Sequence, residues 1–239
     1  DGGKRRALND VGELNADDGE TLVAYRGGQR LAPRMIRLQD RPQVEADWQP
    51  LPAGQPMRLV NLKRGTLDDL KFQPVAFTPP GPGEVAVQVR AAALNFRDVV
   101  CALGLIPDDD DPGLECAGRI VAVGPGVADL AVGDDVLVAA PGAFATYVAA
   151  RAAMVAPKPE GLTYEQAAAI PIAFLTAHHA LIGLAELQAG ERVLIHAASG
   201  GVGLAAVQIA KARGAEGFGT AGTPRKRAYL SSVGGDHVF

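Results

Sequence analysis

The sequence is short of cysteine, of aromatic residues and of long apolar runs, and each shortage excludes a class of protein. Its two cysteines, Cys101 and Cys116, support neither a disulfide framework nor a metal cluster. No apolar run reaches the ~18 residues of a membrane span, and no segment has the pattern of a signal peptide, so we expect a cytoplasmic protein without a membrane partner. A net charge of −4 argues against a nucleic-acid partner.

What is present is the composition of an ordinary globular protein. Of the 239 residues, 48% are hydrophobic and 21% are charged, and the length can hold one large domain or two small ones. The 29 glycines and 17 prolines suit many turns around short strands.

The first part of the chain, residues 1–55, is expected to be a connector. Residues 1–20 are polar and without periodicity, and residues 42–56 are rich in proline. Between them, Thr21–Tyr25 and Leu31–Leu38 flank a Gly-Gly turn, which predicts a β-hairpin.

Residues 56–175 predict a small antiparallel β domain that ends in helices. The expected strands are bounded by Gly or Pro and lie at Val85–Val89, Ala117–Val123 and Asp135–Ala139. Thr163 and Gln166 form a capping-box pattern that opens a helix through Ile170. Pro171 ends or restarts that helix, and a helical pattern continues over Ala173–Leu184.

Residues 176–239 predict the first part of a dinucleotide-binding fold. Val193–Ile195 is a short apolar run, typical of a buried parallel strand, and the turn Ala198-x-Gly200-x-x-Gly203 follows it. Beyond the turn, the apolar positions 202, 206, 209 and 210 have helical spacing. A helix N-terminus after such a turn can bind a pyrophosphate, although a tight turn without a ligand has the same pattern.

The end of the next predicted strand, Glu216–Ala221, indicates which dinucleotide is bound. An NAD site has a carboxylate near this point for the ribose 2′-hydroxyl, and this chain has none there. Instead, Thr223 has the pattern of a helix N-cap, with Pro224 at the first helical position and cations at positions 225–227. These residues favour a 2′-phosphate, and so NADPH, unless the cations form only a solvated helix face.

Several separate motifs resemble the medium-chain dehydrogenase/reductase superfamily, and within it the enoyl reductase domains of modular polyketide synthases and animal-type fatty acid synthases. They are Asn95-Phe-Arg-Asp98, Gly113-Leu-Glu-Cys-Ala-Gly118, Val123-Gly-Pro-Gly126, Val132-Gly-Asp134 and Ala198-Ser-Gly-Gly-Val-Gly203. The segment Val23–Arg34 resembles the connector that precedes such domains. The resemblance implies an α/β fold: a GroES-like antiparallel β domain followed by the first part of a doubly wound parallel Rossmann domain.

The resemblance also implies an activity and its partners. An enoyl reductase transfers hydride from NADPH to Cβ of a trans-2-enoyl thioester, which the phosphopantetheine arm of an acyl carrier protein presents beside the neighbouring synthase domains. Zinc members of the superfamily have a cysteine at position 95 and a histidine at position 114, where this chain has Asn95 and Leu114. No metal is therefore expected.

The resemblance implies roles for particular residues. Ser199, Gly200, Gly201, Val202 and Gly203 would bind the pyrophosphate, and Ala221, Gly222, Thr223 and Lys226 the 2′-phosphate. Asn95 and Thr176 would lie near the nicotinamide and the substrate. Structural alternatives stay open: a turn for Asn95, helix packing for Thr176, an ion pair for Arg97 with Asp98, and core or surface roles for His178 and His179.

Two departures from the family pattern matter. Some members have a proton-donating tyrosine in the substrate segment, and residues 91–106 contain none. The family's lysine and aspartate proposed for protonation would lie beyond position 239. We therefore expect a fragment of a larger protein that binds NADPH poorly and is almost inactive by itself. The alternative functions are a zinc-less quinone oxidoreductase and a non-catalytic structural remnant.

Overall fold

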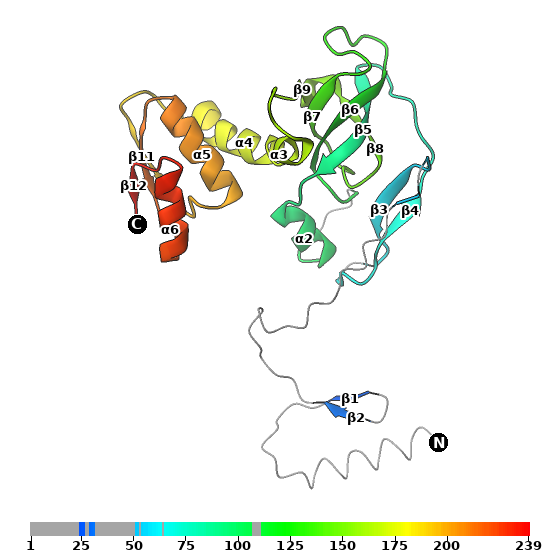
Figure 1. Cartoon of the computed structure of the whole chain (residues 1–239), viewed down its shortest axis with the longest axis horizontal. Helices are drawn as coiled ribbons and strands as arrows, with labels where there is room; N and C mark the ends of the chain where they lie inside the picture. The colour runs from blue at the N-terminus through cyan, green and yellow to red at the C-terminus, as the bar shows by residue number, and fades with distance from the viewer. Residues whose placement is uncertain (1–23, 27–28, 32–50, 53, 64, 107–110) are drawn as a thin grey trace. The chain divides into compact units, whose positions relative to one another are not determined.

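The computed structural model describes residues 24–26, 29–31, 51–52, 54–63, 65–106 and 111–239 (Figure 1). The chain divides into two compact units, residues 1–50 and 51–239. In the first unit, β1 (Ala24–Arg26) and β2 (Gln29–Leu31) pair as antiparallel strands, with Arg26 opposite Gln29. The predicted hairpin is confirmed at its centre, while its outer ends and the rest of the predicted connector before residue 51 lie outside the described residues.

The second unit begins with antiparallel sheets. β3 (Met57–Asn61) pairs with β4 (Leu70–Pro74), and a five-stranded sheet has the order β8-β5-β6-β7-β9. The strands of that larger sheet are β5 (Glu84–Ala92), β6 (Glu115–Val123), β7 (Asp135–Ala139), β8 (Tyr147–Arg151) and β9 (Val155–Pro157). The three strands expected from alternation and turn signals are confirmed, and the register between β5 and β6 shifts twice.

The core of this β domain follows from the alternation of apolar side chains along its strands. Val85 and Val87 of β5 and Val136 and Val138 of β7 are fully buried and pack in one cluster with Ile120 of β6. Because side chains of a strand point alternately to its two faces, such spacing places them on one side of the sheet.

Short helices occur inside the β domain and after it. Inside it are α2 (Phe96–Ala102) and the 3₁₀ turn η2 (Ala152–Met154), and after it α3 (Tyr164–Ala168) and α4 (Pro171–His178) lead to the following region. The Thr163–Gln166 capping box is confirmed by both of its hydrogen bonds, and Pro171 restarts the helix as the first residue of α4. The helical pattern predicted over Ala173–Leu184 is confirmed, and its last part, His179–Leu184, is a π-helical turn, η3.

The last part of the chain has parallel strands alternating with helices, as predicted. β10 (Arg192–Ile195), β11 (Glu216–Gly219) and β12 (His237–Val238) pair in that order, and the connecting helices are α5 (Gly201–Ala212) and α6 (Pro224–Ser232). The strand predicted to reach Ala221 ends at Gly219. Gly219 is paired with Ile195, the last residue of β10, so the parallel pairing ends there, and the Thr220 amide donates to Ile195 O as its last bond.

Helix α4 lies at the junction of these regions. It packs against α5 as well as against β6 and β7 (Figure 1), and its Ala177 is buried in a cluster with Ile195 and Ala206. The predicted domain boundary between residues 175 and 176 therefore falls inside this helix.

One helical stretch, Tyr164–Leu184, is long and apolar enough by length and composition alone to cross a membrane, with a mean hydropathy of 1.6. A helix that packs in the core of a globular fold passes the same test. Here Ala167, Ala168, Pro171 and Ala177 of this stretch are buried inside the fold.

Candidate functional site

The glycine turn after β10 places free amides at the N-terminus of α5. Gly200 is the N-cap residue, and no side chain caps it. The first backbone bond of the helix runs from Leu204 N to Gly200 O, at 2.8 Å. The amides of Gly201, Val202 and Gly203 precede that bond, so they can donate to an anion, and the helix dipole adds to the attraction.

Two glycines of the turn have different structural roles. A Cβ on Gly203 would lie 2.5 Å from Ala197 O and 2.6 Å from Ala198 Cα, so only glycine allows α5 to approach the turn this closely. A Cβ on Gly201 would meet nothing within 4 Å. Gly203 is therefore needed for packing, while Gly201 lines open space at the free amides.

The turn is held in a strained backbone conformation by Thr220. Ala197 has a φ of 50°, a left-handed conformation that costs a residue with a Cβ about 1 kcal/mol or more. Ala197 N donates to the Thr220 hydroxyl at 3.3 Å, and Ala198 N donates to Thr220 O at 2.9 Å. Ala198 is fully buried, which explains an apolar residue where the usual motif has glycine. The sequence analysis missed Thr220, for which no local signal existed.

The predicted 2′-phosphate segment has the expected local structure. Thr223 caps α6 through its hydroxyl, which accepts from Lys226 N at 3.3 Å, and Pro224 is the first helical residue. Arg225 and Lys226 are exposed, whereas Arg227 donates to Ala221 O at 2.9 Å. Two cations therefore remain exposed at the start of a nine-residue helix, and residues 219–223 contain no carboxylate.

Asn95 begins the short helix α2 in the β domain. Its Oδ1 accepts from Arg97 N at 3.0 Å, and the Asp98 carboxylate accepts from Asn95 N at 2.8 Å, which completes a capping box. The other oxygen of Asp98 accepts from Gly113 N at 3.0 Å. Asn95 therefore has a structural role, as a helix cap and not as the turn considered from the sequence, and the cap leaves its side-chain amide NH₂ group outside this set of bonds. Both Asp98 oxygens bind backbone amides.

Thr176 is exposed on α4, where its hydroxyl donates to Ile172 O at 2.6 Å. The amide of the same Ile172 donates to Oε2 of Glu115, at 2.8 Å. Glu115 is 4% exposed, and burial raises the pKa of its carboxyl, against the bond from Ile172, while the charge of Asp98 raises it further. The sequence analysis quoted Glu115 only as part of a motif; the signal it missed is an acidic residue opening a buried strand.

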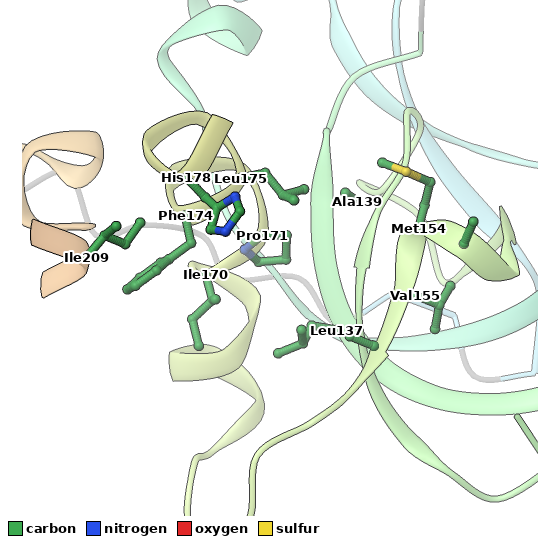
Figure 2. A pocket seen from close by; sticks show the side chains of 12 residues that line it. Leu137, Ala139, Met154, Val155, Ile170, Pro171, Phe174, Leu175, His178 and Ile209 are labelled. Atoms are coloured by element: carbon green, nitrogen blue, oxygen red, sulfur yellow. The ribbon is translucent and has the colours of Figure 1, made fainter. Parts of the chain in front are cut away.

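An apolar cavity of about 350 Å³ lies between the β domain and α4. Figure 2 shows its lining side chains, which come from β7 and the η2–β9 segment on one side, from residues 170–178 on the other, and from Ile209 of α5. His178 lines this cavity, whereas Asn95 and Thr176 do not. Across the described ranges, no three His, Cys, Asp or Glu side chains are grouped to hold a metal ion.

Residues 81–160 match the family model of the alcohol dehydrogenase GroES-like domain. The chain is 46% identical over 224 residues to the spectinabilin polyketide synthase system protein NorB of Streptomyces orinoci, covering 91% of this chain and 10% of that protein. It therefore spans a small part of this curated relative.

Solved structures agree on the fold. The crystal structure of CurK enoyl reductase is 42% identical, with a TM-score of 0.73, and the match covers 77% of this chain and 59% of that one. Quinone oxidoreductase of Escherichia coli, complexed with NADPH, is 34% identical with a TM-score of 0.69, over 77% of this chain and 58% of that one. The expected fold class, a GroES-like antiparallel domain followed by a partial Rossmann-like fold, is confirmed.

Proposed function

Because this chain belongs to the medium-chain dehydrogenase/reductase superfamily, as a relative of polyketide synthase enoyl reductases, we propose that it is part of an NADPH-dependent enoyl reductase domain of such a synthase. The observation that carries the cofactor assignment is the pairing of free amides at the start of α5 with a carboxylate-free, cationic start of α6. The substrate class rests on the likeness to NorB and CurK enoyl reductase.

The residues present fit a dinucleotide phosphate. The amides of Gly201, Val202 and Gly203 bind the pyrophosphate in this proposal, with Ser199 and Gly200 in the same turn, and Gly201 leaves open space for it. Thr223 and Lys226 bind the 2′-phosphate beside Ala221 and Gly222, because a phosphate is stabilised by a cation and by helix N-terminal amides.

The chemistry needs little from the side chains. NADPH, when bound, would supply a hydride for Cβ of the enoyl thioester, and a proton from water or from another group would complete the reduction at Cα. This chain's residues orient the two reactants: Thr176 lies at the nicotinamide and Asn95 at the substrate, where its amide NH₂ can donate to a thioester oxygen that gains negative charge. With Asn95 and Leu114 at the positions where zinc members have ligands, no metal takes part in this scheme.

The proposed enoyl reductase function also implies partners for this chain. The substrate arrives as an enoyl thioester on the phosphopantetheine arm of an acyl carrier protein, among the neighbouring domains of a cytoplasmic synthase. The relatives are synthase components, which supports this placement.

Cofactor preference tests the proposal first. We expect NADPH to bind this chain, although weakly, with a dissociation constant at least about tenfold lower than that of NADH. Lys226→Glu should abolish the preference, because a carboxylate repels the 2′-phosphate, while Arg213→Glu at the end of α5 is the matched control. Equal affinity for both cofactors in the unaltered chain contradicts the assignment.

Acceptor choice tests the reaction. NADPH oxidation is followed with crotonyl-pantetheine and with a quinone, using this chain and a longer chain that includes the following synthase sequence. Reduction of the thioester by the longer chain supports the enoyl reductase. Reduction of the quinone alone supports the quinone oxidoreductase, and an absence of NADPH binding in both chains supports a non-catalytic remnant.

A further inference from the structure

We propose that Glu115 is a positioning residue that sets the orientation of Thr176 through the backbone of Ile172. The inference deepens the proposed function, on which it rests for the placement of Thr176 at the nicotinamide. It is carried by two hydrogen bonds that meet on one residue, with Glu115 Oε2 and Ile172 N 2.8 Å apart and Thr176 Oγ1 and Ile172 O 2.6 Å apart.

The Glu115 carboxylate lies inside the core, where it needs a hydrogen-bond donor. Glu115 is the first residue of β6 and the only charged or polar residue in the buried core of the described chain. Burying a carboxylate without a partner is costly, so a bond to a backbone amide is needed to offset the loss of hydration. That amide belongs to Ile172, 57 residues away in the sequence.

The start of α4 has a backbone amide whose acceptor lies outside the helix. Its N-cap residue, Ile170, makes no side-chain hydrogen bond, and Pro171 at the first helical position has no N–H. The amide of Ile172 is therefore the first donor of the helix that needs an acceptor. Glu115 provides this acceptor from β6, in the manner of an N-cap, and its negative charge is stabilised by the helix dipole.

The Thr176 hydroxyl donates its hydrogen within its own helix. Its hydroxyl hydrogen is directed to Ile172 O one turn earlier, so the lone pairs of Oγ1 remain for an external donor. In this arrangement Thr176 accepts a hydrogen bond, and the carboxamide NH₂ of a nicotinamide is a donor of the right kind. A shift of Ile172 would rotate the hydroxyl away from this orientation.

Asp98 connects the segment that contains Glu115 to Asn95, the other predicted site residue. Asp98 holds the amide of Asn95 with one oxygen and the amide of Gly113 with the other, and Gly113 lies two residues before Glu115. One three-residue segment, Gly113–Glu115, is thus hydrogen-bonded toward Asn95 on one side and toward the helix of Thr176 on the other. The bond from Ile172 N to Oε2 explains why residue 115 is acidic, although an apolar side chain would be buried more easily.

The test compares Glu115→Ala, which removes the acceptor, with Glu115→Gln, whose amide oxygen can still accept from Ile172 N. The control is Gln166→Ala, which removes one bond of the capping box on α3 and leaves α4 alone. Amide hydrogen exchange reports on Ile172, and NADPH titration followed by NMR reports on Thr176. Both use the full 239-residue chain.

We expect Glu115→Ala to speed the exchange of Ile172 by about tenfold and to weaken NADPH binding by about threefold to tenfold, as for the loss of one hydrogen bond. Glu115→Gln should restore both values, and Gln166→Ala should change neither. Thr176→Val should weaken binding in the unaltered chain and add nothing in the Glu115→Ala background, because both changes remove one interaction.

Additive effects of Glu115→Ala and Thr176→Val overturn the proposal, as does unchanged Ile172 exchange in Glu115→Ala. If Glu115→Ala does not fold, Glu115→Asp withdraws the carboxylate by one methylene and must reproduce both losses. If NADPH perturbs no signal of Thr176 in the unaltered chain, the placement of Thr176 at the nicotinamide fails, and Ile172 exchange still decides whether Glu115 caps α4.

Discussion

The antiparallel β domain and the parallel three-stranded region bury their strands to very different degrees. In the β domain, Val85, Val87 and Val136 are fully buried within a five-stranded sheet. In the parallel region, Leu194 in the middle of β10 is 58% exposed. Since parallel strands are ordinarily covered on both faces, the comparison indicates that the stability of the described chain lies mainly in the β domain.

Truncating one apolar side chain in each region should give the largest difference in the free energy of unfolding. Ile120→Ala should lower the free energy of unfolding by about 3 kcal/mol, because the site is fully enclosed. Leu194→Ala should change it by about 0.5 kcal/mol or less, because most of that side chain already contacts water. Chemical denaturation measures both, and equal losses would contradict the comparison.

The glycine turn allows folding to be separated from binding within the parallel region. Gly203→Ala should cost about 1–3 kcal/mol, because its Cβ would meet backbone atoms of Ala197 and Ala198. Gly201→Ala should leave the thermal midpoint nearly unchanged and still weaken NADPH binding. If both variants lose stability equally, Gly201 packs rather than lines the binding site.

Removing one helix cap in each region should give a smaller difference in stability. Thr163→Ala should cost about 1 kcal/mol, because it removes a complete capping box on α3, whose Ala167 and Ala168 are fully buried. Thr223→Ala should cost less in global unfolding, because α6 buries only Leu230, but it should reduce the preference for NADPH over NADH. Thermal unfolding and cofactor titration give the two readings. A larger stability loss at Thr223 would reverse the ranking of the regions.

The smallest expected effects concern surface ion pairs. Hydrogen bonds from Arg119, and then from Tyr164, lower the pKa of Asp135 to about 2. A lowered pKa stabilises the fold above the ordinary value of 3.8, and this contribution is lost as the pH falls toward 2. Asp135→Asn should therefore cost at most about 1 kcal/mol at neutral pH, and only a small part of that at pH 2, where the carboxyl is about half protonated.

The counterpart in the parallel region is Glu216, whose pKa is lowered mainly by the hydrogen bond from His237 and further by the charge of Arg192. Because the Arg192 side chain is mostly exposed and those of Glu216 and His237 are nearly half exposed, Glu216→Gln should change the unfolding midpoint less than Asp135→Asn at neutral pH. The comparison of the two pH profiles is the check, and a larger effect at Glu216 would contradict it.

Local rules predicted many elements of this protein and some of its site. The cap at Thr163, the restart at Pro171, the cap at Thr223 and the glycine turn all follow from neighbouring residues, and the structure contains each of them. Periodicity did not predict the π-helical geometry after His178 or the end of β11 at Gly219, because both depend on how the chain packs.

The sequence by itself determined the order of the elements, where most of them begin, and the fold class. Capping, alternation and turn chemistry depend on residues that are a few positions apart, so they can be predicted from the sequence. Tertiary structure alone decided that Glu115 reaches Ile172, that Asp98 reaches Gly113 and that Thr220 holds the glycine turn. Those contacts join residues far apart in the chain, and their geometry exists only once the strands and helices have packed.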